Sequence, residues 1–336
     1  MRIAGVGILF FTGSLAWGQQ AISVRAGLVH HVEGNASIDG TPVRVDKSKF
    51  ATVKEGSTFT TGDGKAEVLL APGVFMRMDA NSSVKMISGL LTDTRIELTK
   101  GSALVEALEM GKENRVRLNI GNSVSNIVKP GLYAFDAANG SVRVFDGKLE
   151  VNVDQQTLEL GRGREVFVAQ TLAASKFPTK TTSALYDWSK TRSAMIAYAN
   201  IGAARSLNTS GYRITNSLWA YYPAYGMVTF LPRNGYLRSP FGWSWYSPGS
   251  VWQYYAGNQG SANGGSGGGS SSASSGNWGG WGSRGGGGGY SGGGSYSGDG
   301  GFSRSSAMSS APAASSAPAA SAAPAAQSAP GGGRGR

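Results

Sequence analysis

The sequence predicts a mainly β protein: a sandwich or solenoid of short, mostly antiparallel strands, with one connector helix and a disordered Gly/Ser/Pro/Ala tail. Three observations predict it. Apolar and polar residues alternate through much of residues 22–168, which is the period of a β-strand. Gly, Pro, Asn and Asp interrupt this alternation at spacings of roughly 8–12 residues. Beyond residue 256 the composition becomes low-complexity.

The first 18 residues have the pattern of a cleavable secretory signal peptide. Arg2 supplies a positive start, residues 3–11 an apolar run, and residues 14–18 a small-residue exit. A membrane anchor is the weaker interpretation, because a spanning helix needs about 20 apolar residues. We therefore expect a periplasmic or extracellular protein with no transmembrane segment after signal cleavage.

Composition excludes several kinds of chemistry. The chain has no cysteine, so disulfides, thiolate metal sites and cysteine nucleophiles are excluded. The formal net charge is +11. A positive charge suits anionic envelope polymers, but the charges are scattered rather than clustered, which favours a simple role in solubility.

Residues 19–170 are expected to form the β-domain. Two-residue hairpin turns need positive φ at both central positions, which glycine, asparagine and aspartate tolerate. The sequence offers such pairs at Asp39-Gly40, Asn139-Gly140 and Asp146-Gly147. Gly62-Asp63-Gly64 and Lys129-Pro130-Gly131 are also expected to turn the chain.

The order of these signals resembles the FecR domain, the periplasmic module named after the iron-citrate regulator. The resemblance covers about residues 55–168. It rests on Thr60-Thr61-Gly62, Ala66-Glu67-Val68-Leu69-Leu70, Asn81-Ser82-Ser83, Leu98 before Gly101, Gly131-Leu132-Tyr133-Ala134-Phe135, the stretch from Val144 to Val151, Leu160-Gly161 and Glu165. Ala71-Pro72-Gly73 and Leu132 depart from the family's usual residues.

The resemblance implies a location outside the cytoplasm. In the regulator a cytoplasmic anti-sigma segment and a membrane helix precede the module. Here only the signal-like residues 1–18 precede it, so we expect a secreted form that lacks the anti-sigma segment. The alternative is a periplasmic signal-relay component that acts with a separate membrane anti-sigma partner.

Residues 183–205 are predicted to form the connector helix. Ser183 can cap its start, and Gly202 or Gly211 can end it. Apolar residues recur at helical spacing and favour burial over partner binding. They are Leu185, Trp188, Met195, Ile196, Ala199 and Ala203.

Residues 206–256 form an aromatic and proline-rich module. Its four prolines exclude a continuous helix, so short extended pieces and turns are expected. Large aromatic rings can stack on sugar faces, or they can fill the core of a small domain, and the second role is the commoner. The candidate ligand-binding residues are Tyr236, Trp243, Trp245, Tyr246 and Trp252.

Residues 257–336 are predicted to be disordered. They hold half of the chain's glycines, followed by an Ala/Ser-rich stretch with a proline every six residues. Such a composition buries too little apolar surface to offset the entropy of ordering. Four arginines among these residues are too few to indicate nucleic-acid binding, so a spacer is expected.

No pattern in the sequence indicates catalysis, a cofactor or a metal. His30 and His31 are adjacent, so on a regular strand they point to opposite faces and cannot chelate one ion together. The carboxylates Asp63, Glu67 and Asp79 lie near expected turns, and no spacing distinguishes a catalytic pair. Residues 264–268 match a nucleophile elbow but lie in the low-complexity tail. We therefore expect a non-enzymatic protein that binds or scaffolds in the cell envelope, with an envelope polysaccharide or envelope protein as its partner.

Overall fold

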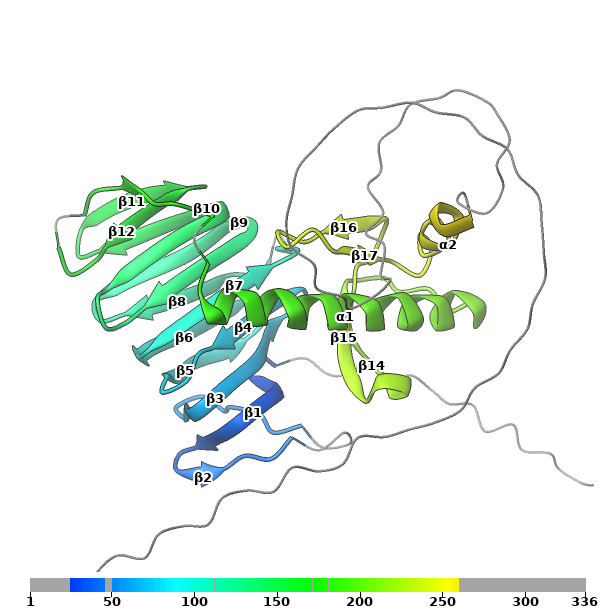
Figure 1. Cartoon of the computed structure of the whole chain (residues 1–336), viewed down its shortest axis with the longest axis horizontal. Helices are drawn as coiled ribbons and strands as arrows, with labels where there is room; N and C mark the ends of the chain where they lie inside the picture. The colour runs from blue at the N-terminus through cyan, green and yellow to red at the C-terminus, as the bar shows by residue number, and fades with distance from the viewer. Residues whose placement is uncertain (1–24, 46–49, 112, 171, 181, 260–336) are drawn as a thin grey trace, which may run out of the picture. The chain divides into compact units, whose positions relative to one another are not determined.

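The computed structural model describes residues 25–45, 50–111, 113–170, 172–180 and 182–259 (Figure 1). The expected signal peptide at 1–18 and residues 260–336 of the expected tail lie outside the described residues. Residues 257–259, predicted to be disordered, are instead the end of a short helix.

Thirteen strands between residues 28 and 176 belong to one sheet. They are β1 (Leu28–Ile38), β2 (Thr41–Pro42), β3 (Thr58–Ala71), β4 (Val74–Met78), β5 (Ser83–Leu90), β6 (Asp93–Lys100), β7 (Ser102–Ala107), β8 (Val116–Ile120), β9 (Ser123–Asp136), β10 (Ser141–Val153), β11 (Gln156–Gly161), β12 (Arg164–Phe167) and β13 (Ser175–Lys176). The prediction of a mainly β protein is confirmed.

Seven of these strands close into a barrel. Their order is β9–β7–β4–β3–β5–β6–β8, and β8 pairs back onto β9. All these pairs are antiparallel except β6–β8, which is parallel. The expectation of a sandwich or solenoid is therefore wrong. The barrel closes because β3 and β9, with 14 residues each, pair with two successive neighbours along one edge.

Facing glycines let these long strands bend. Gly64 of β3 lies opposite Gly34 of β1, and an added Cβ on Gly64 would come within 1.8 Å of the Glu33 carbonyl oxygen. At the second bend, a Cβ on Gly131 of β9 would come within 2.1 Å of the Asp146 carbonyl oxygen of β10. Only glycine permits so close an approach of two backbones.

These bends correct three of the expected turns. Residues 62–64 and 129–131 lie inside β3 and β9, and Asp146-Gly147 lies inside β10, where the register with β9 shifts. Asp39-Gly40 does connect β1 to β2, with positive φ at both residues. Asn139-Gly140 ends a four-residue turn between β9 and β10, in which Gly140 has positive φ.

Helix α1 (Ala184–Thr209) covers residues 184–205 of the predicted helix and continues to Thr209. The Ser183 hydroxyl accepts a hydrogen bond from the Tyr186 amide at 3.2 Å, as the expected cap does. Gly211, with φ of 71°, follows the helix end, whereas Gly202 lies within the helix. Met195 is 49% exposed, so its predicted place on the buried face is wrong.

Polar side chains on α1 hold the elements that follow it. These are β14 (Leu218–Tyr222), the 3₁₀ turn η1 (Pro223–Tyr225), β15 (Met227–Leu231), β16 (Tyr236–Arg238), β17 (Ser244–Tyr246) and α2 (Trp252–Gln259). The Asn200 side chain donates to the Phe230 and Tyr246 carbonyls and accepts from the Tyr246 amide. Thr229 donates to the Ile196 carbonyl at 2.9 Å. The short helix α2 was not predicted.

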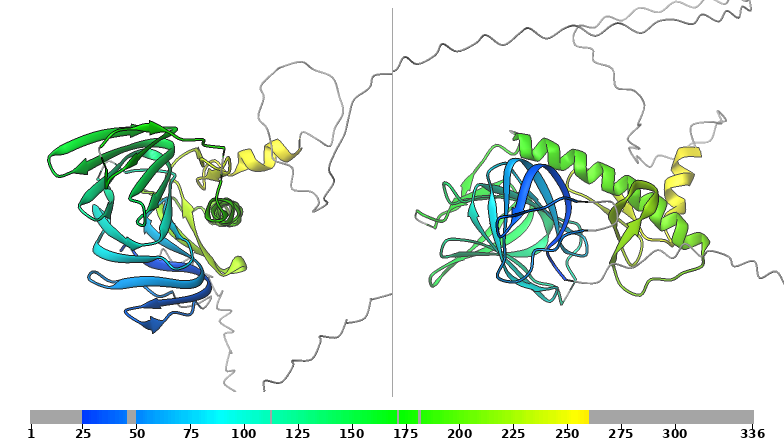
Figure 2. Two further views of the ribbon diagram at one scale, coloured as in Figure 1. Left: turned by 60° about the vertical axis from the view of Figure 1, so that its left-hand side comes forward. Right: turned by 90° about the horizontal axis from the view of Figure 1, so that it is seen from below.

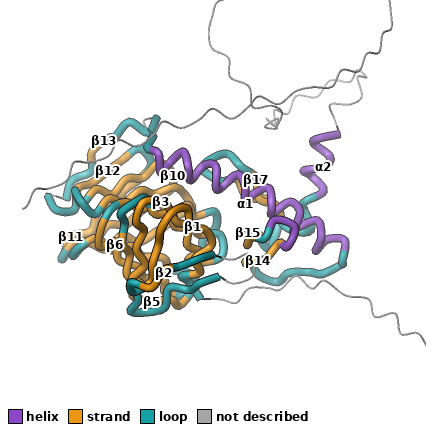
Figure 3. Tube along the Cα trace, turned by 60° about the horizontal axis from the view of Figure 1, so that its bottom comes forward, coloured by secondary structure: helices purple, strands orange, loops and turns teal. Residues whose placement is uncertain are grey.

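Helix α1 runs beside the sheet and continues beside the β14–β15 hairpin (Figures 2 and 3). Strand β4 is consequently buried on both faces. Met76 faces the barrel interior, while Phe75 belongs to a second apolar cluster with Ile196, Phe230 and Trp245. This second cluster contains residues of both the barrel and the C-terminal hairpins, so it is an apolar core that the two parts share.

Candidate ligand-binding surface

The structure separates the five predicted ligand-binding residues. Trp245 is 0% exposed and lies between Phe75 and Phe230, with ring centroids at 5.5 and 6.1 Å. It is a core residue, so its assignment to an open site is wrong. Trp243 is half-buried, and its indole N–H donates to the Lys190 carbonyl at 3.3 Å. Tyr236 and Trp252 are 56% and 60% exposed, and Tyr246 is half-buried.

Two of the five belong to a larger group of exposed or half-buried tyrosines, which we term the tyrosine surface. Its rings contact one another in two series. The first runs through Tyr236, Tyr246, Tyr254 and Tyr255, with successive ring centroids 5.2–6.0 Å apart. The second runs through Tyr198, Tyr225 and Tyr222, with centroids 5.7 and 5.5 Å apart.

The two series meet in a concavity of about 590 Å³. Five tyrosines line it, together with Arg205 and the hydroxyl-bearing Ser206 and Thr209 of α1. The Arg205 guanidinium lies over the Tyr255 ring at 4.9 Å, which joins the end of α1 to α2. No carboxylate lines the concavity.

Local sequence explains how the floor of the concavity forms. Gly202 lies on α1 beneath the Tyr222 ring, and an added Cβ there would come within 2.5 Å of the ring. A glycine in mid-helix costs about 1 kcal/mol relative to alanine, so the absence of a side chain here serves the packing of Tyr222. Burial, together with the hydrogen bond to Tyr198, raises the pKa of Tyr225. Its hydroxyl therefore stays protonated at neutral pH.

A second feature lies between the barrel and α1 and is built from charged side chains. We term it the ion cluster: His30, Glu67, Arg77, Glu106, Arg192 and Ser193. Arg77 Nε donates to Glu67 at 2.7 Å, and Arg77 Nη1 donates to Glu106 at 2.7 Å. Arg192 of α1 donates to Glu67 at 2.8 Å, and the Ser193 hydroxyl donates to Glu106 at 2.8 Å. All six residues are buried.

The charges within the ion cluster balance. Burial by itself would raise the pKa of Glu67, but Arg192, Arg77 and the His30 hydrogen bond outweigh it and hold that pKa well below its ordinary value. Burial likewise opposes the charge of Arg77, yet Glu67 and Glu106 raise the pKa of its guanidinium. Two carboxylates thus face two guanidiniums in a site without water access.

His30 links the ion cluster to the C-terminal hairpin. Its Nε2 accepts a hydrogen bond from the Val228 amide of β15 at 3.0 Å, while its Nδ1 lies 2.8 Å from Glu67. Because Nε2 accepts, the ring proton belongs on Nδ1, which donates to the carboxylate. Burial is the main cause that lowers the pKa of His30, so the ring is neutral.

The two histidines do not point to opposite faces as expected. A β-bulge falls between Val29 and His31, so the strand loses its two-residue alternation there. His31 stacks on Trp188 of α1 at 6.3 Å, while His30 enters the ion cluster beneath the same helix. Within the described residues no three His, Cys, Asp or Glu side chains are grouped as metal ligands would be.

The carboxylates considered for hydrolysis are also placed. Glu67 lies in the interior of β3 rather than near a turn, and the ion cluster occupies both of its oxygens. Asp79 lies 3.5 Å from the Lys65 amine, and Asp63 lies in β3 at the glycine bend. The structure brings none of the three together as a pair with a common cavity.

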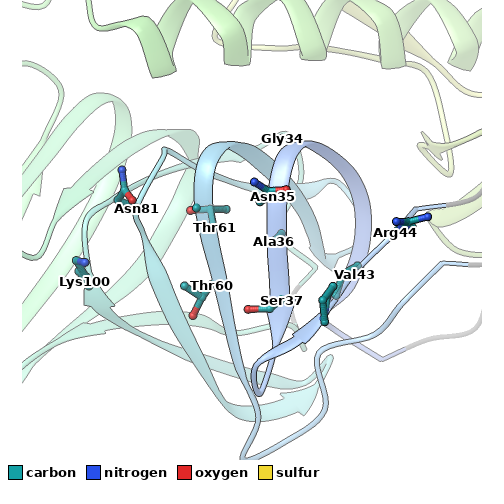
Figure 4. A pocket seen from close by; sticks show the side chains of 12 residues that line it. Gly34, Asn35, Ala36, Ser37, Val43, Arg44, Thr60, Thr61, Asn81 and Lys100 are labelled. Carbon is teal, nitrogen blue, oxygen red and sulfur yellow. The ribbon is translucent and has the colours of Figure 1, made fainter. Parts of the chain in front are cut away.

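A second concavity, of about 580 Å³, lies on the barrel beside the β1–β3 bend. Short polar side chains of Ser37, Thr60 and Asn35 line it, with Arg44 and Lys100 at opposite ends (Figure 4). It has no aromatic side chain and no buried charged group aimed into it. The tyrosine surface is therefore the better candidate site.

Sequence reasoning missed most of the tyrosine surface. Tyr198 and Arg205 lie on the helix that was assigned to core packing, and Tyr222 and Tyr225 flank a proline turn. One signal was present: Tyr198 falls off the apolar face of α1, at a position where a helix normally exposes a charged or polar residue.

Comparisons with known proteins give little further guidance. No protein-family model matches the chain, and no curated protein matches it either. Two crystal structures of a "putative anti-sigma factor" from Parabacteroides distasonis ATCC 8503 are similar in part, at 14% and 13% sequence identity and a TM-score of 0.31 each. Each match covers 36% of this chain and 58% of the solved chain. At that TM-score the likeness carries no argument about function. Among the described residues, no helix combines the length and hydropathy that crossing a bilayer requires.

Proposed function

We propose that the protein is a non-enzymatic, exported binding protein of the cell envelope that holds a polysaccharide on its tyrosine surface. One observation carries the proposal. Among the described residues, the exposed large hydrophobic side chains of the barrel are aliphatic: Ile87, Leu90 and Val128. Those of the C-terminal part are almost all aromatic: Met195, Tyr198, Tyr212, Tyr225, Tyr236 and Trp252.

Physical chemistry favours a sugar ligand for such a surface. An exposed aromatic patch marks an interaction site, since a ring that stays in water lacks the stabilisation that burial of its apolar surface would give. Tyrosine offers a flat apolar face for the C–H face of a sugar ring and a hydroxyl for hydrogen bonding. Two ring series that converge on one concavity of about 590 Å³ suit an extended chain of sugars.

The ion cluster supports a role without catalysis. General acid–base catalysis of glycoside hydrolysis needs carboxyl groups that exchange protons with the substrate. Glu67 and Glu106 are instead buried and bonded to guanidiniums, and no carboxylate lines the tyrosine surface. Assaying the purified protein against glycosides and esters is the direct check, and turnover would overturn the non-enzymatic part.

Export rests on the signal-like pattern of residues 1–18, outside the described residues. Cell fractionation with intact-mass analysis tests it. The expected result is a periplasmic or extracellular species that lacks the first 16–18 residues, and an uncleaved cytoplasmic chain would overturn it.

Binding is tested by co-sedimentation of the full mature chain with purified, insoluble envelope polysaccharide. The double variant Tyr198→Ala/Tyr225→Ala removes two of the three rings of one series and should weaken binding about tenfold, since each ring contact contributes about 0.5–1.5 kcal/mol. Tyr212→Ala makes the same change at an exposed tyrosine outside the concavity and should bind as the wild type does. A wild type that does not sediment, or a double variant that sediments equally well, would contradict the proposal.

The relay role implied by the family resemblance is the competing outcome. It requires a membrane anti-sigma protein to co-purify with the exported chain. If that protein co-purified and the polysaccharide did not, the relay role would replace the binding role.

A further inference from the structure

The segment that contains the tyrosine surface carries charges of almost one sign. From residue 184 to 259 the chain has six cationic side chains and a single carboxylate, Asp187, in the first turn of α1. Arg192 is neutralised by Glu67 in the ion cluster. Arg205, Arg213, Arg233 and Arg238 are exposed, and none of the four forms an ion pair within the described residues.

Two of these arginines lie among the tyrosines. Arg205 lines the concavity and lies over the Tyr255 ring. Arg238 lies two residues from Tyr236 on β16, so both side chains project from the same face of that strand. The N–H groups of a guanidinium lie in its own plane. A guanidinium that stacks on an aromatic face can therefore still donate them in a bidentate contact with an anion.

We propose that the tyrosine surface selects anionic polysaccharides over neutral ones, with Arg205 binding an acidic group of the sugar chain. This inference rests on the proposed polysaccharide-binding function and names its ligand class. Sugar faces stack on the tyrosines, while Arg205 and Arg238 pair with carboxylate or phosphate groups along the chain. With no carboxylate in the lining, nothing repels such a chain from the concavity.

The experiment uses two matched pairs of probes with the full mature protein. Polygalacturonate is compared with its fully methyl-esterified form, which keeps the sugar backbone and masks the carboxylates. Phosphomannan is compared with the same polymer after dephosphorylation. In at least one pair the acidic form should bind about tenfold or more tightly, because a charge-assisted bidentate contact is lost in the neutral form. The pair that discriminates identifies the anion.

Substitutions assign the effect to Arg205. Arg205→Gln should weaken binding of the acidic form about tenfold, leave binding of the neutral form unchanged and reduce the salt dependence. Arg205→Lys keeps the charge but not the planar fork, so an intermediate loss is expected. Arg164→Gln removes an exposed arginine from β12 of the barrel and should change neither affinity.

The outcomes separate the two proposals. If the wild type binds neither form of either polymer, nor envelope polysaccharide, the proposed function itself fails. If it binds acidic and neutral forms equally, or if Arg205→Gln weakens both forms alike, binding stands and the anion selection is wrong. Unchanged thermal unfolding midpoints for the exposed arginine variants show that a loss of binding is not a loss of folding.

Discussion

The two halves of helix α1 use opposite chemistry. In the first half, Arg192 and Ser193 are buried against the barrel and belong to the ion cluster. In the second half, Tyr198 and Arg205 are exposed above the β14–β15 hairpin and belong to the tyrosine surface. The helix therefore buries charge in its first half and displays Tyr198 and Arg205 in its second half.

This contrast shows which groups are available for binding. Each charge of the ion cluster has a partner of the opposite sign, and those contacts fix the position of α1 on the barrel. The rings of the tyrosine surface contact one another and are exposed or half-buried. A surface that is not saturated by the protein's own contacts is where a ligand can add favourable contacts.

The largest effect is expected when the ion cluster loses its central cation. Arg77→Met leaves Glu67 and Glu106 buried without their shared partner, which should lower the free energy of unfolding by about 5 kcal/mol, the upper end of the range for a broken buried pair. Arg143→Met breaks the partly exposed pair with Glu165 and should cost about 1 kcal/mol or less. Urea unfolding followed by circular dichroism measures both.

A compensated variant sharpens this test. Arg77→Met combined with Glu106→Gln removes the uncompensated charge, because Glu67 keeps its pair with Arg192, and it should recover much of the lost stability. If this double variant were as unstable as Arg77→Met alone, the shape of the side chains rather than their charge would account for the stability of the cluster. If Arg77→Met cost no more than Arg143→Met, the ion cluster would not hold α1 in place.

A somewhat smaller effect separates the two tryptophans that the sequence grouped together. Trp245→Ala opens a cavity between Phe75 and Phe230, so the free energy of unfolding should fall by about 4 kcal/mol. Trp252→Ala changes a ring that is 60% exposed and should stay within about 0.5 kcal/mol of the wild type. Equal losses in the two variants would mean that Trp245 does not belong to the shared core.

The strands could be predicted from sequence, but the closure of the barrel could not. Alternation is a local signal, and it indicated the strands of the β-domain correctly. Closure depends on the pairing of β8 with β9, and on β3 and β9 each pairing with two strands along one edge. Whether one strand pairs with two others along the same edge depends on the whole sheet, so no local pattern indicates it. Gly64 and Gly131, which allow the bends, have the local signature of turns. The sequence therefore predicted a turn within each of β3 and β9, where the structure has one continuous bent strand.

The candidate site was predicted less well, for a related reason. The sequence grouped Trp243 and Trp245 as candidate ligand-binding residues, but burial of Trp245 is decided by Phe75 and Phe230, which lie outside its own short strand. The sequence alone does not indicate that Arg192 is buried, because a charge on a helix is normally solvated. Its burial becomes favourable only when β3 supplies Glu67, and no window of sequence around the helix contains that residue.

The smallest expected effect is a pH dependence of stability, which arises in the ion cluster at the first half of α1. The pKa of His30 is lowered in the folded protein, so below the ordinary value of about 6.5 the unfolded chain binds a proton that the folded chain refuses. The contribution of His30 to the free energy of unfolding is therefore fully present above pH 6.5. It is lost as the pH decreases below 6.5, by at most about 1.4 kcal/mol per pH unit for one histidine. Burial and Arg192 also lower the pKa of His31, which adds a contribution of the same sign. Urea unfolding between pH 6.5 and 5 measures the slope, in a range where Glu67 remains ionised.

His30→Asn assigns the slope to the ion cluster. An asparagine amide can still donate to Glu67 but does not titrate, so the variant should be less stable at pH 7 and should show a flatter pH dependence. His31→Asn is the matched control and should remove only the smaller part of the pH dependence of stability, because His31 is partly exposed. A wild-type stability that is flat from pH 6.5 to 5 would show that the folded and unfolded chains protonate His30 alike. Nε2 would then not be held as the acceptor of the Val228 amide, and the neutral His30 link between barrel and hairpin would have to be abandoned.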